Sequence, residues 1–538
     1  MAHLSRRPVY HFIAPRGWMN DPCAPGYDPL TGRFHLFYQW TPHSHRWERI
    51  AWGHATSKDL LHWAHDSQDM PALKADTEYD KEGVFTGCFW PTGPKGEDAL
   101  TVFYTNVWEA PHFTKPYTRG CEGLALATSA DGGKTWNKHP CNPIIAEEPE
   151  GLNVTGFRDP YLGPWPAMDR ARGTSGRLYG LNSGGIHGQG PRTFLYDVDP
   201  TDLTRWTYLY PLFRSHSARS RPGGKWGGDL GLNLECTNFV TLSAGDVERE
   251  VIITGSEGGA PRPRGGEPRY GVWVLGSLEG EEVDLDISAA GMVDWGALYA
   301  FNTFLHQGRR ILWGWLIEED LSDGILAERG WTGCLGVPRE LFLASYSGVT
   351  GTLKSKVADV GSFEVLPSGE VVTLGMRPLP ELVHLRGSHI SQAISLGGSH
   401  FRCEAARACT IDLVVEVTDG TEEVALHVRQ SADGSTRTSI SFFPKEEVIK
   451  VCREHSNDRA DIVKTTEEGP FTLLRFSELE RLRMTVLLDG DVLEVFANDR
   501  FALSTRIYSP AEATGVAYEH KGLARVEHLD VWEMKAAQ

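Results

Sequence analysis

The sequence predicts an all-β protein, a five-bladed β-propeller followed by a C-terminal β-sandwich, and two observations support this prediction. The first is a repeated phrase. Residues 57–63, 129–136 and 199–206 each form a polar turn that ends on a tryptophan, and a strand-like segment precedes each turn. The interval is about seventy residues both times, which fits a propeller blade with long loops. The second is a change in the sequence pattern after about residue 345. At about seventy residues per blade, the chain up to this point would contain about five blades.

The segments between these phrases have the composition of β-strands. They are short, rich in β-branched and aromatic residues, and separated by loops of Gly, Pro and Asp. Sustained helical periodicity is nearly absent. The predicted strands cover residues 34–40, 51–55, 100–104, 123–128, 177–181, 193–196, 251–254, 270–275 and 310–315.

The C-terminal part alternates apolar and polar residues at 410–417, 424–428, 483–488 and 492–496. Asp489-Gly490 lies between the last two segments as a hairpin turn, which is typical of an antiparallel sandwich. We expect a propeller over residues 1–345, a connector over 346–395 and a sandwich over 396–538. Residues 477–482 form either a short helix or a loop, since Ser477 and Glu480 have the spacing of a capping box.

The charge balance narrows the choice of partners. With 53 basic and 71 acidic residues, the net charge of −18 argues against nucleic acid and anionic membranes. A neutral small molecule remains compatible. The 17 tryptophans either fill the core or offer flat faces to sugar rings.

The cysteines and the N-terminal residues are informative about the cellular compartment of the protein. Nine cysteines without a C-x-x-C pair make a disulfide framework or a zinc site unexpected. Residues 1–8 contain no apolar leader, and no apolar run reaches transmembrane length. We therefore expect a cytoplasmic protein in which the sequon at Asn153 is unused; a trimmed secreted chain is the competing explanation. A homodimer through the sandwich is left open.

Three carboxylates lie in segments dense in aromatic residues, Gly or Pro: Asp21, Asp159 and Glu235. Glycosidic bonds are commonly cleaved by two carboxyl groups that flank the anomeric carbon, one as nucleophile or base and one as acid. We expect Asp21 and Glu235 to be that pair. Arg158 would keep Asp159 ionised, so that it counters positive charge in the transition state.

Each acid has an ordinary alternative reading. An aspartate before proline is usually a turn residue, and Arg158-Asp159 alone would more often be a surface ion pair. In a propeller, however, the inner strands converge on the axis. We therefore expect all three acids on the first strands of their blades, facing one funnel.

Several segments, in order, resemble the successive motifs of glycoside hydrolase family 32. They are residues 18–22 (WMNDP), 37–39 (FYQ), 52–54 (WGH), 83–87 (GVFTG), 157–160 (FRDP), 235–236 (EC), 330–333 (GWTG), 338–340 (PRE) and 494–499 (EVFAND). The match runs from about residue 10 to the C-terminus.

The resemblance implies a five-bladed propeller with a sandwich and a retaining double displacement. Asp21 would be the nucleophile, Asp159 the transition-state stabiliser and Glu235 the acid/base. The residues that would line the fructosyl pocket are Asn20, Gln39, Trp47, Phe85, Thr86, Arg158 and Trp315. No metal or organic cofactor is implied, and retention predicts carboxyl groups of Asp21 and Glu235 about 5–5.5 Å apart.

Two departures from the family pattern point to a subgroup. Cys23-Ala24 stands where Asn-Gly is common, and Thr86 stands where the family has serine. Together with residues 116–120, 183–188 and 500–505 they are similar to the fungal transfructosylating β-fructofuranosidases, which make short fructo-oligosaccharides from sucrose. We hypothesise that Cys23 makes the acceptor subsite less polar and so slows water relative to sugar.

The function expected from the sequence is therefore a retaining β-fructofuranosidase that acts on sucrose, with fructosyl transfer as well as hydrolysis. An exo-acting inulin or levan hydrolase would use the same residues. An inverting arabinan-type enzyme would separate its acid and base by about 6.5–9.5 Å. A non-catalytic sugar-binding protein on this fold would be suggested by loss of an acid, yet all three are present.

Overall fold

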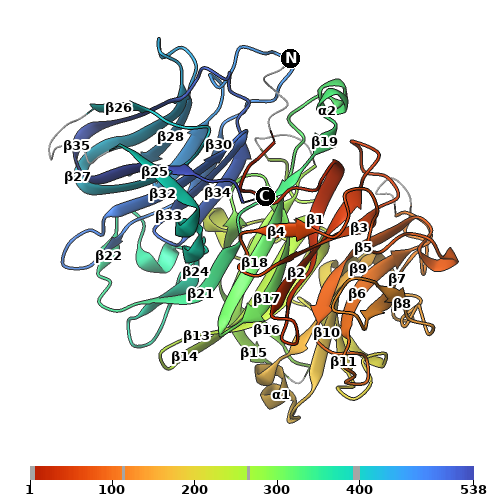
Figure 1. Cartoon of the computed structure of the whole chain (residues 1–538). Coiled ribbons are helices and arrows are strands. Elements are labelled where there is room, and N and C mark those ends of the chain that lie inside the picture. Colours follow the sequence, from red (N-terminus) through yellow and green to blue (C-terminus); the bar gives the residue numbers. More distant parts are fainter. Residues whose placement is uncertain (1–6, 112–115, 263–266, 281, 392–399, 538) are drawn as a thin grey trace.

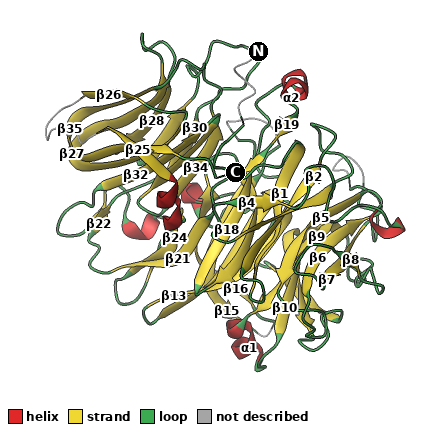
Figure 2. Cartoon of the chain, in the orientation of Figure 1, coloured by secondary structure: helices red, strands yellow, loops and turns green. Residues whose placement is uncertain are grey.

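Five antiparallel sheets surround a common axis in the computed structural model, and a separate assembly of strands packs beside them (Figure 1). The structure describes all residues except 1–6, 112–115, 263–266, 281, 392–399 and 538. Strands dominate both parts, and the helices are short (Figure 2). The predicted all-β fold, a five-bladed propeller with a C-terminal sandwich, is confirmed.

Blades one to four each contain four consecutive strands, and the first strand of each lies nearest the axis. They are β1 (Gly17–Asp28), β2 (Arg33–Thr41), β3 (Ala51–Ser57) and β4 (Trp63–His65); β5 (Gly83–Trp90), β6 (Leu100–Val107), β7 (Glu122–Ser129) and β8 (Asn137–Lys138); β9 (Val154–Pro164), β10 (Leu178–Ile186), β11 (Gly190–Val198) and β12 (Trp206–Leu212); β13 (Asn233–Ala244), β14 (Val247–Glu257), β15 (Tyr270–Glu279) and β16 (Asp284–Asp294).

Blade five is built from β17 (Leu298–His306), β18 (Arg309–Leu316), β21 (Arg339–Tyr346), β24 (Val371–Pro378) and β23 (Glu364–Val365), with β20 (Cys334–Leu335) on β18. Strand β19 (Trp331–Thr332) leaves this region and pairs in parallel with β1, where Gly17 faces Trp331. This pairing joins the last blade to the first and closes the ring. The helices are α1 (Pro166–Arg172) and α2 (Asp323–Arg329), with 3-10 turns at Glu78–Asp80, Gly224–Trp226, Val357–Asp359 and Pro380–Leu385.

The repeated tryptophan phrase is the turn between the third and fourth strands of blades one to three. In each turn the indole N–H of Trp63, Trp136 or Trp206 donates to the carbonyl oxygen three residues earlier, at 3.0, 2.9 and 3.0 Å. The indole therefore closes the turn in the same way each time. This shared contact explains why the phrase recurs at blade spacing.

All five inner strands break their pairing at a β-bulge, where one extra residue stands on the inner strand. The register shifts fall between Met19 and Pro22 on β1, Phe85 and Gly87 on β5, Arg158 and Tyr161 on β9, Glu235 and Asn238 on β13, and Tyr299 and Asn302 on β17. A bulge bends the strand and re-aims its side chains. Three of the bulges contain a non-glycine residue with positive φ: Asp159 (59°), Cys236 (48°) and Ala300 (52°).

The sandwich follows from the alternation seen in the sequence. Its strands are β25 (Arg386–Ser391), β26 (His400–Glu404), β27 (Ala408–Gln430), β28 (Thr438–Phe443), β29 (Val448–Cys452), β30 (Glu467–Pro470), β32 (Leu482–Asp489), β33 (Val492–Ala497), β34 (Phe501–Arg506) and β35 (Gly515–Met534). The predicted segments 410–417 and 424–428 are both parts of β27. A two-stranded sheet of β22 (Gly351–Thr352) and β31 (Leu474–Arg475) lies apart.

The structure describes residues 346–391 of the expected connector and all of residues 477–482. Residues 346–395, expected as a connector, contain β23 and β24, which pair within blade five. The expected start of the sandwich at residue 396 lies outside the described residues, so the domain limits stay predictions. Residues 477–482 form a loop without a helix. The Glu480 carboxylate does not cap a helix, because it accepts from the Leu474 amide at 2.7 Å and from the Arg500 guanidinium.

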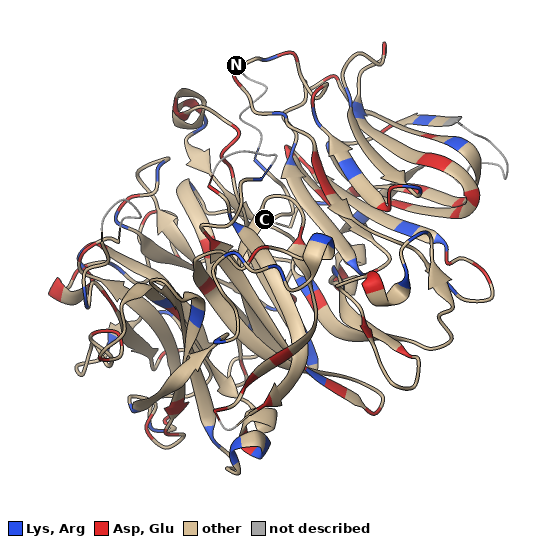
Figure 3. Cartoon of the chain, turned by 180° about the vertical axis from the view of Figure 1, so that it is seen from behind, with Lys and Arg blue, Asp and Glu red and all other residues tan. Residues whose placement is uncertain are grey.

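The structure gives the state of the cysteines, the length of the helices and the distribution of the charged residues. All nine cysteines are free thiols. Among the described residues, no helix is long and apolar enough to cross a membrane. Charged side chains occur mainly in the loops and on the sandwich strands, while the propeller strands are largely uncharged (Figure 3).

A buried ionic cluster joins the propeller to the sandwich. The Arg339 guanidinium, on β21, donates to Asp294 and to Glu494, each at 2.8 Å, and to the Ser504 hydroxyl at 2.7 Å. Asp294 belongs to blade four, whereas Glu494 and Ser504 belong to the sandwich. One cation therefore holds carboxylates from both parts of the chain.

The N-terminal segment enters the same interface. The backbone N–H groups of Val9, Tyr10 and His11 donate to the Asp489 carboxylate at 2.8–2.9 Å. The His11 ring contacts Asp489 at 2.9 Å and Glu494 at 3.0 Å. Burial alone would lower the pKa of His11, but its hydrogen bonds to these two carboxylates raise it to about 9. His11 is therefore held as a cation between two anions.

We expect Arg339→Met to lower the free energy of unfolding by about 3–5 kcal/mol, because it leaves buried carboxylates without their cation. The control is Arg377→Met, since Arg377 is 42% exposed and pairs with Glu340 at 3.0 Å. That variant should lose about 1 kcal/mol or less. Urea denaturation of both variants measures the difference, and equal losses would contradict a stabilising role for the cluster.

Candidate active site

The three predicted acids meet at one end of the propeller axis. Asp21 lies on β1, Asp159 on β9 and Glu235 on β13, the first strands of blades one, three and four. Cys236 links them, since its Sγ lies 3.9 Å from Asp21 Oδ2 and 3.6 Å from Asp159 Oδ2. The Cys236 backbone N–H also donates to Asp159 at 3.0 Å. The bulges on β1, β9 and β13 therefore bring residues distant in sequence into one site.

A network of side-chain hydrogen bonds holds Asp21. Its carboxylate accepts from the Thr86 hydroxyl at 2.6 Å, from Asn20 at 3.0 Å and from Gln39 at 3.4 Å. Gln39 also donates to Thr86 at 2.8 Å and accepts from Asn20 at 2.7 Å. Burial raises the pKa of Asp21 to about 6; Glu235 adds to the rise, whereas Thr86 and Asn20 oppose it. The carboxylate is thus fixed in place and titrates near neutral pH.

Arg158 contacts three glutamates in addition to its effect on Asp159. Its Nε lies 3.2 Å from Glu122 and 3.4 Å from Glu235, and its Nη2 lies 3.9 Å from Glu257. Burial raises the pKa of Asp159 well above its ordinary value, and repulsion from Glu235 outweighs the opposing effect of Arg158. Arg158 lowers the pKa of Asp159, which is the expected direction, but its guanidinium is shared among three glutamates; that Asp159 acts as an anion therefore stays a prediction.

Glu235 is partly buried, with 17% of its side chain exposed. Its Oε2 accepts from the Tyr299 hydroxyl at 2.8 Å, and its Oε1 faces Arg158. Sequence reasoning missed Glu122, Glu257 and Tyr299. Glu122 begins the apolar strand β7, where a charged residue needs a buried partner, and this pattern could have identified it. Nothing in the sequence distinguishes Glu257 or Tyr299 from other residues of their type.

The predicted aromatic residues lie around these acids. Trp47, on the loop between β2 and β3, is 45% exposed, and its ring meets the edge of Phe85 at 5.5 Å between centroids. Trp315, on β18, is buried and packs on Trp18 at 6.0 Å. Its indole N–H has no hydrogen-bond partner among the described residues.

The hypothesis that Cys23 makes the acceptor subsite less polar stays a prediction, and the structure places the thiol below the surface of the site. Cys23 is fully buried, with its Sγ 3.5 Å from the Asp21 carbonyl oxygen and 3.7 Å from the Thr86 hydroxyl. The thiol therefore lies beneath Asp21 and Thr86, in the wall between strands. Any effect of this residue on the reaction would act through those two side chains.

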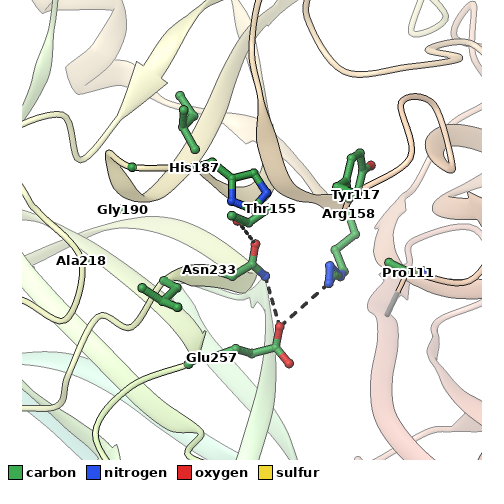
Figure 4. A pocket seen from close by; sticks show the side chains of 13 residues that line it. Pro111, Tyr117, Thr155, Arg158, His187, Gly190, Ala218, Asn233 and Glu257 are labelled. Atoms are coloured by element: carbon green, nitrogen blue, oxygen red, sulfur yellow. Dashed lines mark hydrogen bonds and ion pairs between the residues drawn. The ribbon is translucent and has the colours of Figure 1, made fainter. Parts of the chain in front are cut away.

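A cavity of about 410 Å³ lies beside Arg158 and Glu257 (Figure 4). It is lined by Pro111, Tyr117, Thr155, Arg158, Ile186, His187, Gly188, Gly190, Ala218, Leu232, Asn233, Glu257 and Gly258. Asn233 bridges the wall, accepting from Thr155 at 2.8 Å and donating to Glu257 at 3.2 Å. Burial raises the pKa of Glu257 well above its ordinary value, and Glu235 adds to the rise.

Two polar groups of this cavity wall are unused. The Tyr117 hydroxyl and Nη1 of Arg158 are buried without a hydrogen-bond partner among the described residues. Buried polar groups are normally paired, so such atoms mark places where a ligand can supply the partner. The cavity therefore offers donors and acceptors to a hydroxyl-rich molecule beside Arg158 and Glu257.

Known proteins resemble the chain over almost its whole length. The acid beta-fructofuranosidase of Phaseolus vulgaris is 27% identical, over 99% of this chain and 80% of its own. Among solved structures, the Aspergillus kawachii beta-fructofuranosidase with glycerol has a TM-score of 0.87 at 26% identity, covering 99% and 95% of the two chains. The A. japonicus fructosyltransferase shares the fold, with a TM-score of 0.86, 24% identity and coverage of 99% and 96%.

The expected cytoplasmic location is contradicted by further relatives. Acid beta-fructofuranosidases from a Rosa hybrid cultivar and from Arabidopsis thaliana, 25% and 26% identical over 99% and 95% of this chain, are named as vacuolar. The two matches cover 82% and 76% of these relatives' own lengths. The expectation relied on the first residues and on unpaired cysteines, and neither determines the compartment of a folded enzyme.

Family models match both parts of the chain. The model of the glycosyl hydrolases family 32 N-terminal domain covers residues 11–354, and that of the family 32 C terminal covers residues 381–533. The two matches include the propeller with its three acids and the sandwich with its share of the buried ionic cluster. The chain belongs to glycosyl hydrolase family 32.

Proposed function

We propose that this glycoside hydrolase is a retaining β-fructofuranosidase that acts on sucrose and passes the fructosyl unit to a second sugar as well as to water. The observation that supports the proposal is the position of Glu235, whose carboxyl group contacts Arg158 at 3.4 Å. On one side lie Asp21 and Asp159, and on the other lies the cavity lined by Arg158 and Glu257. Arg158 thus connects the carboxyl group of Glu235 to a space large enough for a second sugar.

Asp21 acts as the nucleophile. Its three hydrogen-bond donors, Thr86, Asn20 and Gln39, fix both carboxylate oxygens, so little reorganisation precedes attack on the anomeric carbon. The bond from that carbon to the glycosidic oxygen breaks as the bond to Asp21 forms. Asp159, across the site, accepts hydrogen bonds from the sugar hydroxyls and offsets positive charge on the ring.

Glu235 acts first as acid and then as base. It donates its proton to the departing glycosidic oxygen, and it later removes a proton from the hydroxyl that attacks the fructosyl-enzyme. The Tyr299 hydroxyl and Arg158 hold opposite oxygens of this carboxyl group. They keep it directed between the donor and the acceptor during both steps.

The acceptor cavity favours transfer. Its volume of about 410 Å³ lies in the range of small-molecule sites. The Tyr117 hydroxyl, which has the weakly hydrogen-bonding Cys121 thiol beside it, and Arg158 Nη1 can pair with sugar hydroxyls, which retains a second sugar in the cavity. A retained sugar competes with water for the fructosyl-enzyme, so transfer rises with sucrose concentration. The name of the A. japonicus relative, a fructosyltransferase, is consistent with such a cavity.

Product analysis at high sucrose concentration tests the proposal. We expect free glucose in excess of free fructose, with a trisaccharide appearing. Equal glucose and fructose would reduce the function to hydrolysis. Release of fructose from inulin or levan but not from sucrose would show the exo-acting hydrolase instead. No turnover of any of these sugars would indicate a sugar-binding protein.

Tyr117→Phe should lower the ratio of transfer to hydrolysis roughly two- to fivefold at high sucrose, since one hydrogen bond to the acceptor is lost. Hydrolysis at low sucrose should be unchanged. Tyr210→Phe is the matched control, because the Tyr210 hydroxyl is also buried without a partner among the described residues but lies outside the cavity lining. Equal ratios in both variants would remove Tyr117 from the acceptor site.

Thr86→Val should shift the acid limb of kcat/KM to higher pH. Asp21 must be ionised to attack, and its pKa of about 6 is held down by the Thr86 hydrogen bond, so removing that bond raises the pKa further. Activity is then lost at a higher pH as the solution is acidified. Thr86→Ser keeps the hydroxyl and should leave the limb in place; a shift in both variants would point to packing instead.

The retaining mechanism predicts that the first fructose released from sucrose is the β-anomer, because two displacements restore the configuration. Proton-decoupled carbon NMR during the first turnovers reads the anomer before mutarotation. Initial release of the α-anomer would show a single displacement and exclude Asp21 as a covalent nucleophile.

A further inference from the structure

The opposite end of the propeller axis contains a second cavity, of about 360 Å³. All five inner strands contribute to it through residues beyond their bulges, and β18 adds Arg310. It is lined by Pro25, Gly26, Tyr27, Cys88, Phe89, Trp90, Pro91, Tyr161, Leu162, Gly163, Pro164, Pro166, Phe239, Val240, Thr241, Thr303, Phe304, Leu305 and Arg310. The catalytic acids lie on the same strands at or before the bulges, so the two sites occupy opposite ends of one axis.

The lining of this axial cavity is aromatic and contains no carboxylate. Six rings surround it, those of Tyr27, Phe89, Trp90, Tyr161, Phe239 and Phe304. Tyr161 and Phe239 meet edge to face, with 5.1 Å between centroids. A mainly apolar, aromatic cavity with few polar groups is the usual form of a small-molecule site.

Arg310 is the single charged residue of the lining. Its Nη1 donates to the Tyr161 hydroxyl at 3.0 Å, and its buried Nε has no hydrogen-bond partner among the described residues. Within the described part of the chain, no carboxylate forms an ion pair with it. The preceding residue, Arg309, differs, because it pairs with Glu340 and Glu381. A partly buried arginine without an anion is unusual, above all in a chain of net charge −18.

The two threonine hydroxyl groups of the cavity are already engaged. Thr241 donates to Glu250 at 2.9 Å, and Thr303 donates to Asn238 at 2.9 Å. A sugar would therefore find few partners for its several hydroxyls. The remaining features of the cavity are its aromatic side chains and Arg310. A ligand with a flat ring and one anionic group fits them, because the aromatic side chains can stack on its ring and Arg310 can bind a planar carboxylate through two parallel hydrogen bonds.

We propose that the axial cavity binds a small aromatic carboxylate, with its ring among the aromatic side chains and its carboxylate on Arg310. Asn238 forms the layer between the two sites, accepting from Thr303 and donating to the Cys236 carbonyl oxygen at 2.9 Å. Because this layer belongs to the packed wall, the aromatic ligand and the sugar occupy separate places. The site does not depend on which sugar the enzyme uses.

Isothermal titration calorimetry of the whole protein with trans-cinnamate tests the proposal. We expect saturable binding of one molecule per chain, and binding of the uncharged cinnamyl alcohol that is roughly tenfold or more weaker. Arg310→Gln should weaken cinnamate binding by a similar factor. Arg309→Gln, the neighbouring arginine outside the cavity, should leave it unchanged. Added fructose should not displace cinnamate, and sucrose turnover by Arg310→Gln should match that of the unchanged protein.

Three outcomes would overturn the inference: no saturable heat at millimolar cinnamate, equal affinity for cinnamate and cinnamyl alcohol, or displacement of cinnamate by fructose. Equal loss of binding in the Arg309 and Arg310 variants would also contradict the inference, because it would show that positive charge attracts cinnamate from a distance and not through direct contact with Arg310. The comparison of the two probes uses the unchanged protein, so it remains decisive if a variant fails to fold.

Discussion

Five inner strands that converge on one axis cannot all continue as regular ladders, and each resolves the crowding with one extra residue. The bulge releases that residue from pairing and turns the side chains around it toward the axis. Asp21, Thr86, Asp159 and Cys236 all stand within such bulges, and Glu235 begins one. The geometry that closes the propeller and the geometry that assembles the acids are therefore the same feature of the backbone.

The charge arrangement follows from this convergence. Five carboxylates, Asp21, Glu122, Asp159, Glu235 and Glu257, approach one another in a buried space, with Arg158 placed among the three glutamates. Burial and mutual repulsion raise the pKa values of Asp21, Asp159 and Glu257. Such a space disfavours further negative charge and favours the positive charge that develops on a sugar ring as its glycosidic bond breaks.

The sequence was sufficient to predict the features that depend on residues close together in the chain. The three tryptophan turns recur because each indole closes its own turn, so the repeat is visible in the residues themselves. Asp21, Asp159 and Glu235 were recognisable through their neighbours. The partners of Arg158 were not, because Glu122 and Glu257 come from other blades and meet it only through the folded ring. The burial of Cys23 was not predictable for a related reason: which face of β1 it occupies depends on the bulge between Met19 and Pro22, which no short motif encodes.

The contact of Val9, Tyr10 and His11 with Asp489 has a consequence for biosynthesis. The segment leading into blade one finds its hydrogen-bond acceptor 478 to 480 residues later in the chain. It also pairs with the far end of the sandwich, where the Ala537 amide donates to the Val9 carbonyl oxygen at 2.9 Å. On the ribosome, the middle blades can fold as they emerge. Residues 9–11 can complete this interface only after residues 489 and 537 have been synthesised, so the segment before blade one is fixed later than the blades that follow it.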